Sequence, residues 1–274
     1  MASEPKEFKD NLAELVFVRA SMLIIYSVLL FITGLCIGSF LNVLVLRIDN
    51  LSTVWKGRSF CPNCKHELSW YDLVPLFSFA TLLGKCRYCK KKISWQYPAV
   101  ELGVGILFLL LFLKLGIGLA LIYYLAIFSI LTVVFIYDLK TQMVPEVFVW
   151  IALAMSFVGG WYFGNFSFID MLYGGLIGGG LFALLVIVSK ETWMGAGDIK
   201  IGLILGFLLG YPVAIFGLFS AFVMGSIVGL IYMKVASKTI KDPLPFAPFI
   251  IASILVGMIF GKGIIGWYWG NYFW

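Results

Sequence analysis

The sequence Met194-Gly195-Ala196-Gly197-Asp198-Ile199-Lys200 places a carboxylate beside two glycines, just before an uncharged apolar run from Ile201 to Met233. That run is too long for one membrane crossing of about 20 residues, and Gly210-Tyr211-Pro212 divides it at a turn. We therefore expect a short helix that begins near Asp198, then a full-length one. A charged group at a bilayer edge requires an explanation, either as a functional group or as a helix cap.

The composition indicates that most of this chain lies in a lipid bilayer. Of its 274 residues, 62% are hydrophobic and 12% are charged, and the mean hydropathy is +1.01. A chain of this kind cannot present a surface compatible with water, so it is expected to cross the membrane several times. The net charge of +6 is then no sign of nucleic-acid binding. No nucleic-acid partner is expected.

Uncharged segments mark the expected crossings, and basic residues indicate their orientation. Nine Lys and Arg residues lie between Arg47 and Lys92, so this segment is expected in the cytoplasm. Alternation of the crossings places fifteen of the 20 basic residues on that side and five on the other. Both chain ends would then face away from the cytoplasm. The expected crossings are 20–46, 93–113, 115–137, 147–169, 171–189, a short sixth and a full seventh within 201–233, and 243–261.

Two Cys-x-x-Cys motifs lie in the one sizeable soluble segment. Cys61 and Cys64 form the first pair, and Cys86 and Cys89 form the second after a short loop. Four thiolates from two such motifs suit tetrahedral zinc, and four protein ligands leave no open position, so the zinc would be structural. Disulfides are disfavoured in the cytoplasm, and a thioredoxin-like redox pair would occur once. His66, the only histidine, is expected at the surface or beside the site.

Carboxylates remain as the candidate catalytic groups, because neither an HExxH nor a GxSxG pattern is present. Asp138 closes the third expected crossing and Asp198 opens the sixth, at the same membrane level. Two neighbouring carboxyl groups, one protonated and one ionised, are what an aspartic protease uses. The alternatives stay open: Asp138 could be a helix-end residue near Lys140, and Asp198 could be an N-cap.

Several segments of the chain together resemble bacterial type IV prepilin peptidases, intramembrane aspartic proteases of the GxGD type. The likeness covers roughly residues 30 to 260, and the combination is more specific than any single motif. One departure is Ala247, which stands in Pro245-Phe246-Ala247-Pro248 where the family usually has glycine. The segments that carry the likeness are GSFLNV (38–43), WYDLVP (70–75), GKCR (84–87), YPAVE (97–101), DLKTQMVP (138–145) and GAGDIK (195–200).

The resemblance implies a bifunctional enzyme of the bacterial inner membrane, with its active site at the cytoplasmic face and both termini in the periplasm. Such an enzyme cleaves the basic leader of type IV prepilins or pseudopilins after a glycine. It then N-methylates the new amino terminus with S-adenosylmethionine. By the same resemblance Asp138 and Asp198 match the catalytic pair, and the four cysteines match the zinc ligands. The oligomeric state is left undetermined.

Three further acidic residues are candidates for substrate or cofactor contacts. Glu101, just inside the second expected crossing, is a candidate for holding the new amine or the amino group of S-adenosylmethionine, with pairing to a nearby Lys or Arg as the alternative. Glu146 and Glu191 are candidates for contacts to the positive charge of the leader. For the methyl transfer there is no glycine-rich nucleotide motif after a strand.

The expected fold is an all-α polytopic membrane protein with about eight transmembrane helices and a small cytoplasmic zinc-knuckle segment. Residues 1–46 would form an N-terminal segment with the first crossing, 47–97 the four-cysteine segment associated with methyl transfer, and 98–274 a seven-helix peptidase core. Two other functions compete. An ion-coupled transporter would carry acidic groups near mid-membrane, and a membrane-tethered zinc-ribbon adaptor would function without either aspartate.

Overall fold

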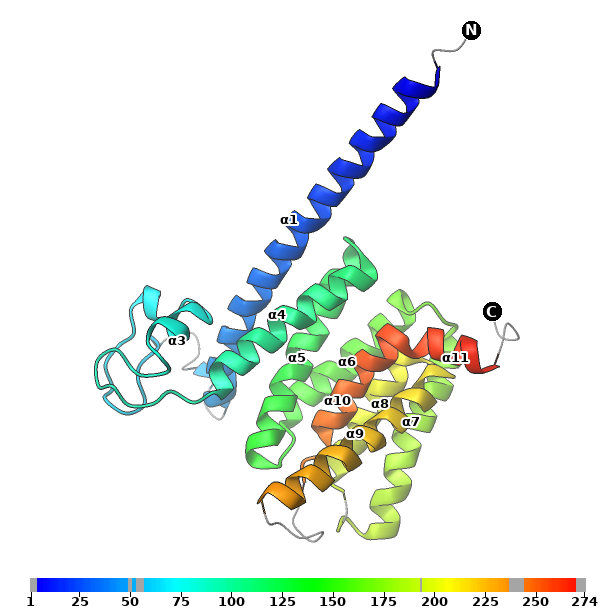
Figure 1. Cartoon of the computed structure of the whole chain (residues 1–274). Coiled ribbons are helices and arrows are strands. Elements are labelled where there is room, and N and C mark those ends of the chain that lie inside the picture. Colours follow the sequence, from blue (N-terminus) through cyan, green and yellow to red (C-terminus); the bar gives the residue numbers. More distant parts are fainter. Residues whose placement is uncertain (1–3, 49–50, 53–56, 193, 237–243, 270–274) are drawn as a thin grey trace. The chain divides into compact units, whose positions relative to one another are not determined.

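A computed structural model describes residues 4–48, 51–52, 57–192, 194–236 and 244–269. Within these ranges the chain is helical, apart from loops and two isolated β-bridges in the four-cysteine segment. The fold divides into two compact units, Met1–Leu121 and Ile122–Trp274, and each is described by itself. The elements in chain order are α1 (Glu4–Leu46), η2 (Trp70–Asp72), α3 (Phe77–Thr81), α4 (Gln96–Leu115), α5 (Leu119–Thr141), α6 (Glu146–Phe163), α7 (Phe168–Ser189), α8 (Ala196–Leu209), α9 (Val213–Ala236), α10 (Ala247–Val256), η3 (Gly257–Gly261) and α11 (Lys262–Trp269) (Figure 1).

Seven helical segments in the described ranges are long and apolar enough to cross a membrane. The prediction of an all-α polytopic membrane protein is thereby confirmed. The expected short sixth crossing is α8, whose 14 residues span only about 21 Å against a hydrocarbon core of about 30 Å, so it does not count among the seven. The seven segments are Phe17–Leu46, Gln96–Leu115, Leu119–Thr141, Glu146–Phe163, Phe168–Ser189, Val213–Val235 and Ala247–Trp267.

In the first unit, α1 lies along α4 over its C-terminal half (Figure 1). Gly34 and Gly38, one helical turn apart on α1, form the closest contacts. A Cβ added to Gly34 would lie 2.8 Å from Cα of Gly105, and one added to Gly38 would lie 2.8 Å from Cα of Glu101. Small residues at this spacing let two helix backbones approach closely in a membrane.

In the second unit, α7 and α8 pack backbone against backbone. Gly174 and Gly178 on α7 face Gly206 and Gly202 on α8, so each helix contributes two glycines one turn apart. A Cβ on Gly178 would lie 2.2 Å from the carbonyl oxygen of Gly202, and one on Gly206 would lie 2.1 Å from that of Gly174. Gly180 does not belong to this contact face, because a Cβ added there would meet nothing within 4 Å.

The predicted turn after the short helix is confirmed. Gly210 ends α8 with a φ of +65°, a conformation that glycine adopts without steric cost, and α9 begins at Val213. The backbone N–H of Tyr211 donates to the carbonyl of Asp170 at 2.9 Å, which ties this turn to the start of α7. The core of the unit centres on α8, where Ile201, Ile204 and Leu205 are fully buried.

The glycine contact between α7 and α8 yields a stability prediction. Gly206→Ala should destabilise the protein by about 1–3 kcal/mol, because the new methyl group collides with backbone that cannot move aside. The matched control is Gly180→Ala, also inside α7 but facing open space, which should be neutral or stabilising by about 0.5–1 kcal/mol. Thermal unfolding of the two variants in the same detergent measures the difference. Equal melting temperatures would show that the contact is not close.

Candidate functional site

Asp198 lies in the first turn of α8, three positions after the N-cap residue Gly195. Its side chain is buried, with 8% exposure, and accepts a hydrogen bond from the backbone N–H of Gly195. The expectation that Asp198 might itself be the N-cap is therefore wrong. Its carboxylate does satisfy one free donor at the helix start, where a negative charge is also favoured by the helix dipole.

The two glycines beside Asp198 have different surroundings. Gly197 lies against Val144 of the α5–α6 connection, and a Cβ there would approach the Val144 side chain to 2.7 Å. A Cβ added to Gly195 would have no neighbour closer than 4.0 Å, and its backbone conformation is an ordinary extended one. Gly197 is thus required by packing within the protein. Gly195 leaves space next to Asp198.

Asp138 lies in the last turn of α5 and is 4% exposed. Its carboxylate accepts a hydrogen bond from the backbone N–H of Ala247, the first residue of α10. As the first residue of α10, Ala247 has a free N–H. The next positions offer no other free donor, because Pro248 has no N–H and the N–H groups of Phe249 and Ile250 both bond to the carbonyl of Phe246. The carboxylate of Asp138, itself in the last turn of α5, therefore lies against the N-terminus of α10.

The two aspartates lie near enough for the charge of one to act on the other. They come from α5 and α8 of the second unit, and the charge of Asp138 acts on the carboxyl group of Asp198. Both are buried, and each receives one backbone N–H, from Ala247 and from Gly195. Two carboxyl groups so placed favour a singly ionised pair, because burying two adjacent negative charges is costly. The arrangement provides one proton acceptor and one proton donor side by side.

The four cysteines of the first unit converge on one point. The Sγ atoms of Cys61, Cys64, Cys86 and Cys89 all lie within 4.8 Å of one another, and those of Cys61 and Cys89 are 3.9 Å apart. Four sulfurs bound tetrahedrally to zinc at about 2.3 Å would be separated by about 3.8 Å, so the donor set and its spacing fit that metal. His66 is exposed and stacks on Tyr88 with ring centroids 3.6 Å apart, outside the cluster.

Each cysteine pair is built by the same backbone pattern. In the first, the N–H of Cys61 bonds to the carbonyl of His66 and the N–H of Lys65 bonds back to Cys61. The second repeats these bonds 25 positions later, from Cys86 to Lys91 and from Lys90 to Cys86. An isolated bridge closes each motif, and Lys65 and Lys90 both have a φ of +59°. The two motifs are thus structural copies of one turn.

Hydrogen bonds prepare Cys89 for a role as a ligand. The backbone N–H of Lys91 and the side-chain amide of Asn63 hold the pKa of Cys89 at about 6. Thiolate is the form that binds metals, so this cysteine is poised for ligation near neutral pH. The Asn63 side chain is itself fixed by Lys91, whose ammonium donates to its carbonyl oxygen at 2.7 Å. The first motif thus supplies a hydrogen-bond donor, the side chain of Asn63, to a cysteine of the second motif.

Asp72 connects the loop between the motifs to the second motif. Its carboxylate, with a side chain only 3% exposed, pairs with Arg87 at 2.7 Å and accepts a hydrogen bond from the Tyr88 hydroxyl at 3.2 Å. The guanidinium of Arg87 also lies 5.0 Å from the centroid of the Tyr71 ring. These contacts hold the segment together where it is too short for a hydrophobic core.

Glu101 lies in the second turn of α4 and is 8% exposed. Its carboxylate accepts hydrogen bonds from the backbone N–H of Leu76, at 2.9 Å, and from the side chain of Ser39. Leu76 has a φ of +58°, an uncommon conformation for leucine, which aims its N–H at the carboxylate. Both donors are uncharged, and among the described ion pairs none involves Glu101. The alternative of pairing with Lys or Arg is not supported.

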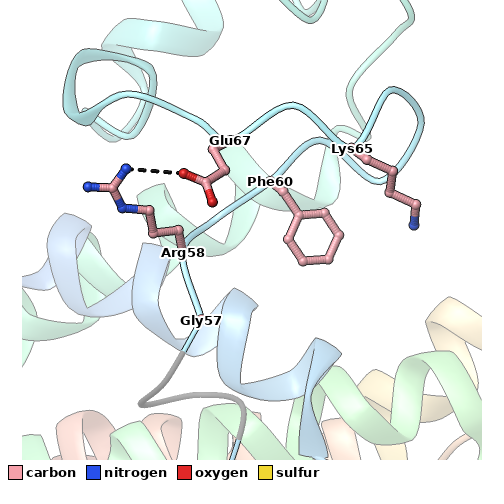
Figure 2. A pocket seen from close by; sticks show the side chains of 5 residues that line it. All are labelled: Gly57, Arg58, Phe60, Lys65 and Glu67. Carbon is pink, nitrogen blue, oxygen red and sulfur yellow. Dashed lines mark hydrogen bonds and ion pairs between the residues drawn. The ribbon is translucent and has the colours of Figure 1, made fainter.

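A shallow pocket of about 320 Å³ lies beside the first cysteine motif. Figure 2 shows its lining, Gly57, Arg58, Phe60, Lys65 and Glu67, with an ion pair between Arg58 and Glu67. The cations of Arg47 and Lys65 lie 5.9 and 5.4 Å from the centroid of the Phe60 ring. None of the sequence-predicted site residues lines this pocket.

Two sets of residues near the aspartates were missed by the sequence reasoning. The first is Ala247, whose backbone N–H bonds to Asp138. The two prolines that flank Phe246-Ala247 are a sequence signal for the start of a helix, and proline has no N–H to donate. The second is the pair Glu146 and Lys200, which joins α6 to α8. Glu146 had been considered only as a contact for the leader. Glu191, the other such candidate, is exposed.

Known proteins match this chain along most of its length. Residues 32–115 match the Bacterial Peptidase A24 N-terminal domain, and residues 125–230 match the Type IV leader peptidase family. A prepilin leader peptidase/N-methyltransferase of Bacillus subtilis is 32% identical over 246 residues, which cover 88% of this chain and 96% of that protein. Proteins of the same name from Myxococcus xanthus (33% identity, 78% of this chain, 65% of that protein) and Legionella pneumophila (29%, 86% and 92%) are also similar.

No solved structure gives a significant match. The similarity to the Bacillus subtilis protein spans nearly the whole of both chains, and the two matched domains follow each other in order. The chain belongs to the family of prepilin leader peptidases/N-methyltransferases.

Proposed function

We propose that this protein cleaves the basic leader peptide of type IV prepilins or pseudopilins and then N-methylates the new N-terminal residue with S-adenosylmethionine. The relatives carry both activities in their names, which supports the pair of reactions. The observation that carries the peptidase assignment is the interacting pair of buried aspartates, Asp138 and Asp198. Neither a transporter nor a zinc adaptor requires two carboxyl groups held together in this way.

The cleavage chemistry follows from the singly ionised pair. The ionised carboxylate takes a proton from a water molecule as its oxygen attacks the carbonyl carbon of the scissile bond. The neutral carboxyl group donates its proton toward the carbonyl oxygen, and the peptide bond then breaks with protonation of the leaving amine. No covalent bond to the protein forms. The N–H groups of Ala247 and Gly195 orient the two side chains throughout.

The proposed location is the bacterial inner membrane, with the aspartates and the four-cysteine segment on the cytoplasmic side and both termini in the periplasm. The distribution of basic residues supports this orientation, because positive charge accumulates in cytoplasmic loops. A substrate with a basic leader and an apolar helix would present the junction between them at the same boundary. We assign residues 47–97 to methyl transfer and residues 98–274 to the peptidase, with 1–46 as the first membrane segment.

Replacing either aspartate tests the peptidase. Asp138→Asn and Asp198→Asn should each reduce prepilin cleavage by about 100- to 10,000-fold, because each removes one partner in proton transfer. Asp170→Asn is the matched control. Asp170 occupies the third position of α7, as Asp198 does in α8, and accepts a hydrogen bond from the N–H of the N-cap residue Ser167. It therefore has the same role at a helix start as Asp198 but is not one of the two paired aspartates. Cleavage is read as a gel shift of a purified prepilin. Substantial cleavage by Asp138→Asn or Asp198→Asn would refute the assignment.

Zinc content tests the proposed metal. The purified protein should contain about one zinc ion per chain, and Cys61→Ser or Cys86→Ser should remove it, because four thiolates are needed to complete the site. Cys36→Ser is the matched control, since Cys36 lies in α1 outside the cluster and should leave the zinc in place. Elemental analysis measures the ratio. Zinc that persists after loss of two cluster cysteines would contradict the site.

Glu101 is the proposed anchor for an amino group in the methylation step. A buried carboxylate whose hydrogen-bond donors are uncharged has no cationic partner among the described ion pairs, so it can pair with an ammonium group, either the new N-terminus or the amino group of S-adenosylmethionine. When bound, that cofactor supplies an activated methyl group. Ser39 and Leu76 hold the carboxylate in a fixed direction.

The variant Glu101→Gln separates the two activities. It should lower methyl incorporation from labelled S-adenosylmethionine by about 10- to 100-fold, the loss expected for one charge-assisted hydrogen bond. Leader cleavage should stay close to that of the unmodified protein. Glutamine keeps the size of the side chain and an acceptor for Leu76, so folding is preserved. Methylation at the normal rate would exclude this role for Glu101.

A further inference from the structure

Lys200 makes two contacts that the cleavage chemistry does not use. It lies in α8, two residues after Asp198, and its ammonium forms an ion pair with the carboxylate of Glu146. The same ammonium lies 4.8 Å from the centroid of the Trp150 ring, a cation–π distance. Glu146 and Trp150 are four residues apart on α6 and therefore share one face. The Lys200 side chain is 22% exposed, whereas its partners Glu146 and Trp150 lie at the surface, with a side-chain exposure of 62% for Glu146.

These contacts join the two chain segments that immediately follow the aspartates. Asp138 is in the last turn of α5, and Glu146 begins α6 after a connection of only four residues. Helix α8 packs extensively on α7 and α6, whereas α5 makes no comparable contact with α8 in the described part of the chain. The position of Asp138 relative to Asp198 therefore depends on two links: the hydrogen bond from Ala247 of α10, which packs on α8, and the contact between the start of α6 and the start of α8.

A second contact lies at the same joint. Val144, in the connection between α5 and α6, rests on Gly197, next to Asp198, so closely that no side chain fits at position 197. The apolar contact at Val144 and the ionic contact at Glu146 lie two residues apart. Together they fix the connection at two points along the first turn of α8.

We propose that Lys200 is a positioning residue that, through Glu146 and Trp150, sets the separation of the Asp138 and Asp198 carboxyl groups. The proposal rests on the peptidase function proposed above. Proton transfer between the pair and the substrate requires a defined geometry, and a displacement of about 1 Å costs about 100-fold in rate. Lys200 itself touches neither carboxyl group in this assignment. Its loss should slow the chemical step and leave substrate binding intact.

Steady-state cleavage of a purified prepilin by the full-length protein in detergent provides the test. Lys200→Met and Glu146→Gln should each lower kcat by about 10- to 100-fold, with KM changed less than about twofold. Lys200→Arg should keep most of the activity, because arginine retains both the ion pair and the cation–π contact. The charge swap Glu146→Lys with Lys200→Glu should recover at least about tenfold over either single reversal.

The chain offers a matched control in the ion pair of Arg58 and Glu67. Glu67 and Glu146 have the same side-chain exposure, 62%, and each pairs with one basic residue. Glu67→Gln should leave kcat for leader cleavage unchanged. Thermal unfolding of every variant distinguishes slower chemistry from loss of the fold. Should Lys200→Met unfold, Glu146→Gln and Trp150→Leu test the proposal in its place, and each should lower kcat with little change in KM.

Three results would overturn the proposal. One is an unchanged kcat in folded Lys200→Met or Glu146→Gln. Another is a charge swap that recovers nothing. The third is a rise in KM restricted to basic leaders, with normal cleavage of a neutral leader, which would make Glu146 a direct contact for the leader. Failure of the peptidase function itself gives a different result, since cleavage would then survive Asp138→Asn and Asp198→Asn.

Discussion

Close backbone contact between α7 and α8 is the constraint on which the rest of the second unit depends. At 14 residues α8 is too short to span a bilayer, so it must be enclosed by neighbouring helices. The paired glycines of the two helices remove the side chains that would hold them apart. The first turn of α8 begins at the surface, where Gly195 and Ala196 are exposed, and Asp198 is its buried residue.

The carboxylate of each aspartate lies against a helix N-terminus, which helps to retain two carboxyl groups in an apolar surrounding: Asp198 lies in the first turn of α8, and Asp138, itself in the last turn of α5, contacts the start of α10. Each gains one backbone N–H, Asp138 from α10 and Asp198 from its own helix, and each lies at the positive end of a helix dipole. These contributions offset part of the cost of burial.

The four-cysteine segment is too short for a hydrophobic core. Two copies of one turn instead place its four sulfurs together.

The sequence was most informative where the chemistry is local. Uncharged runs predicted the crossings, the spacing of Cys61 to Cys89 predicted a cluster, and Gly210-Tyr211-Pro212 predicted a turn that the structure contains. Contacts between distant segments were beyond such reasoning. The bond from Ala247 to Asp138 spans more than 100 residues, and nothing in the composition of either segment indicates the other. The pairing of Glu146 with Lys200 depends in the same way on how α6 packs on α8.

Through its hydrogen bond from Ala247, the Asp138 carboxylate belongs both to the aspartate pair and to the start of α10. The amide of Ala247 is buried at the start of α10, where the first N–H groups have no acceptor within the helix. A side chain without an acceptor at position 138 would strand that amide, at a cost of about 1–3 kcal/mol. The site and the last membrane helix are therefore coupled mechanically. Movement of α10 would reach the Asp138 carboxylate through a single hydrogen bond, and a change at the carboxylate would reach α10 by the same route.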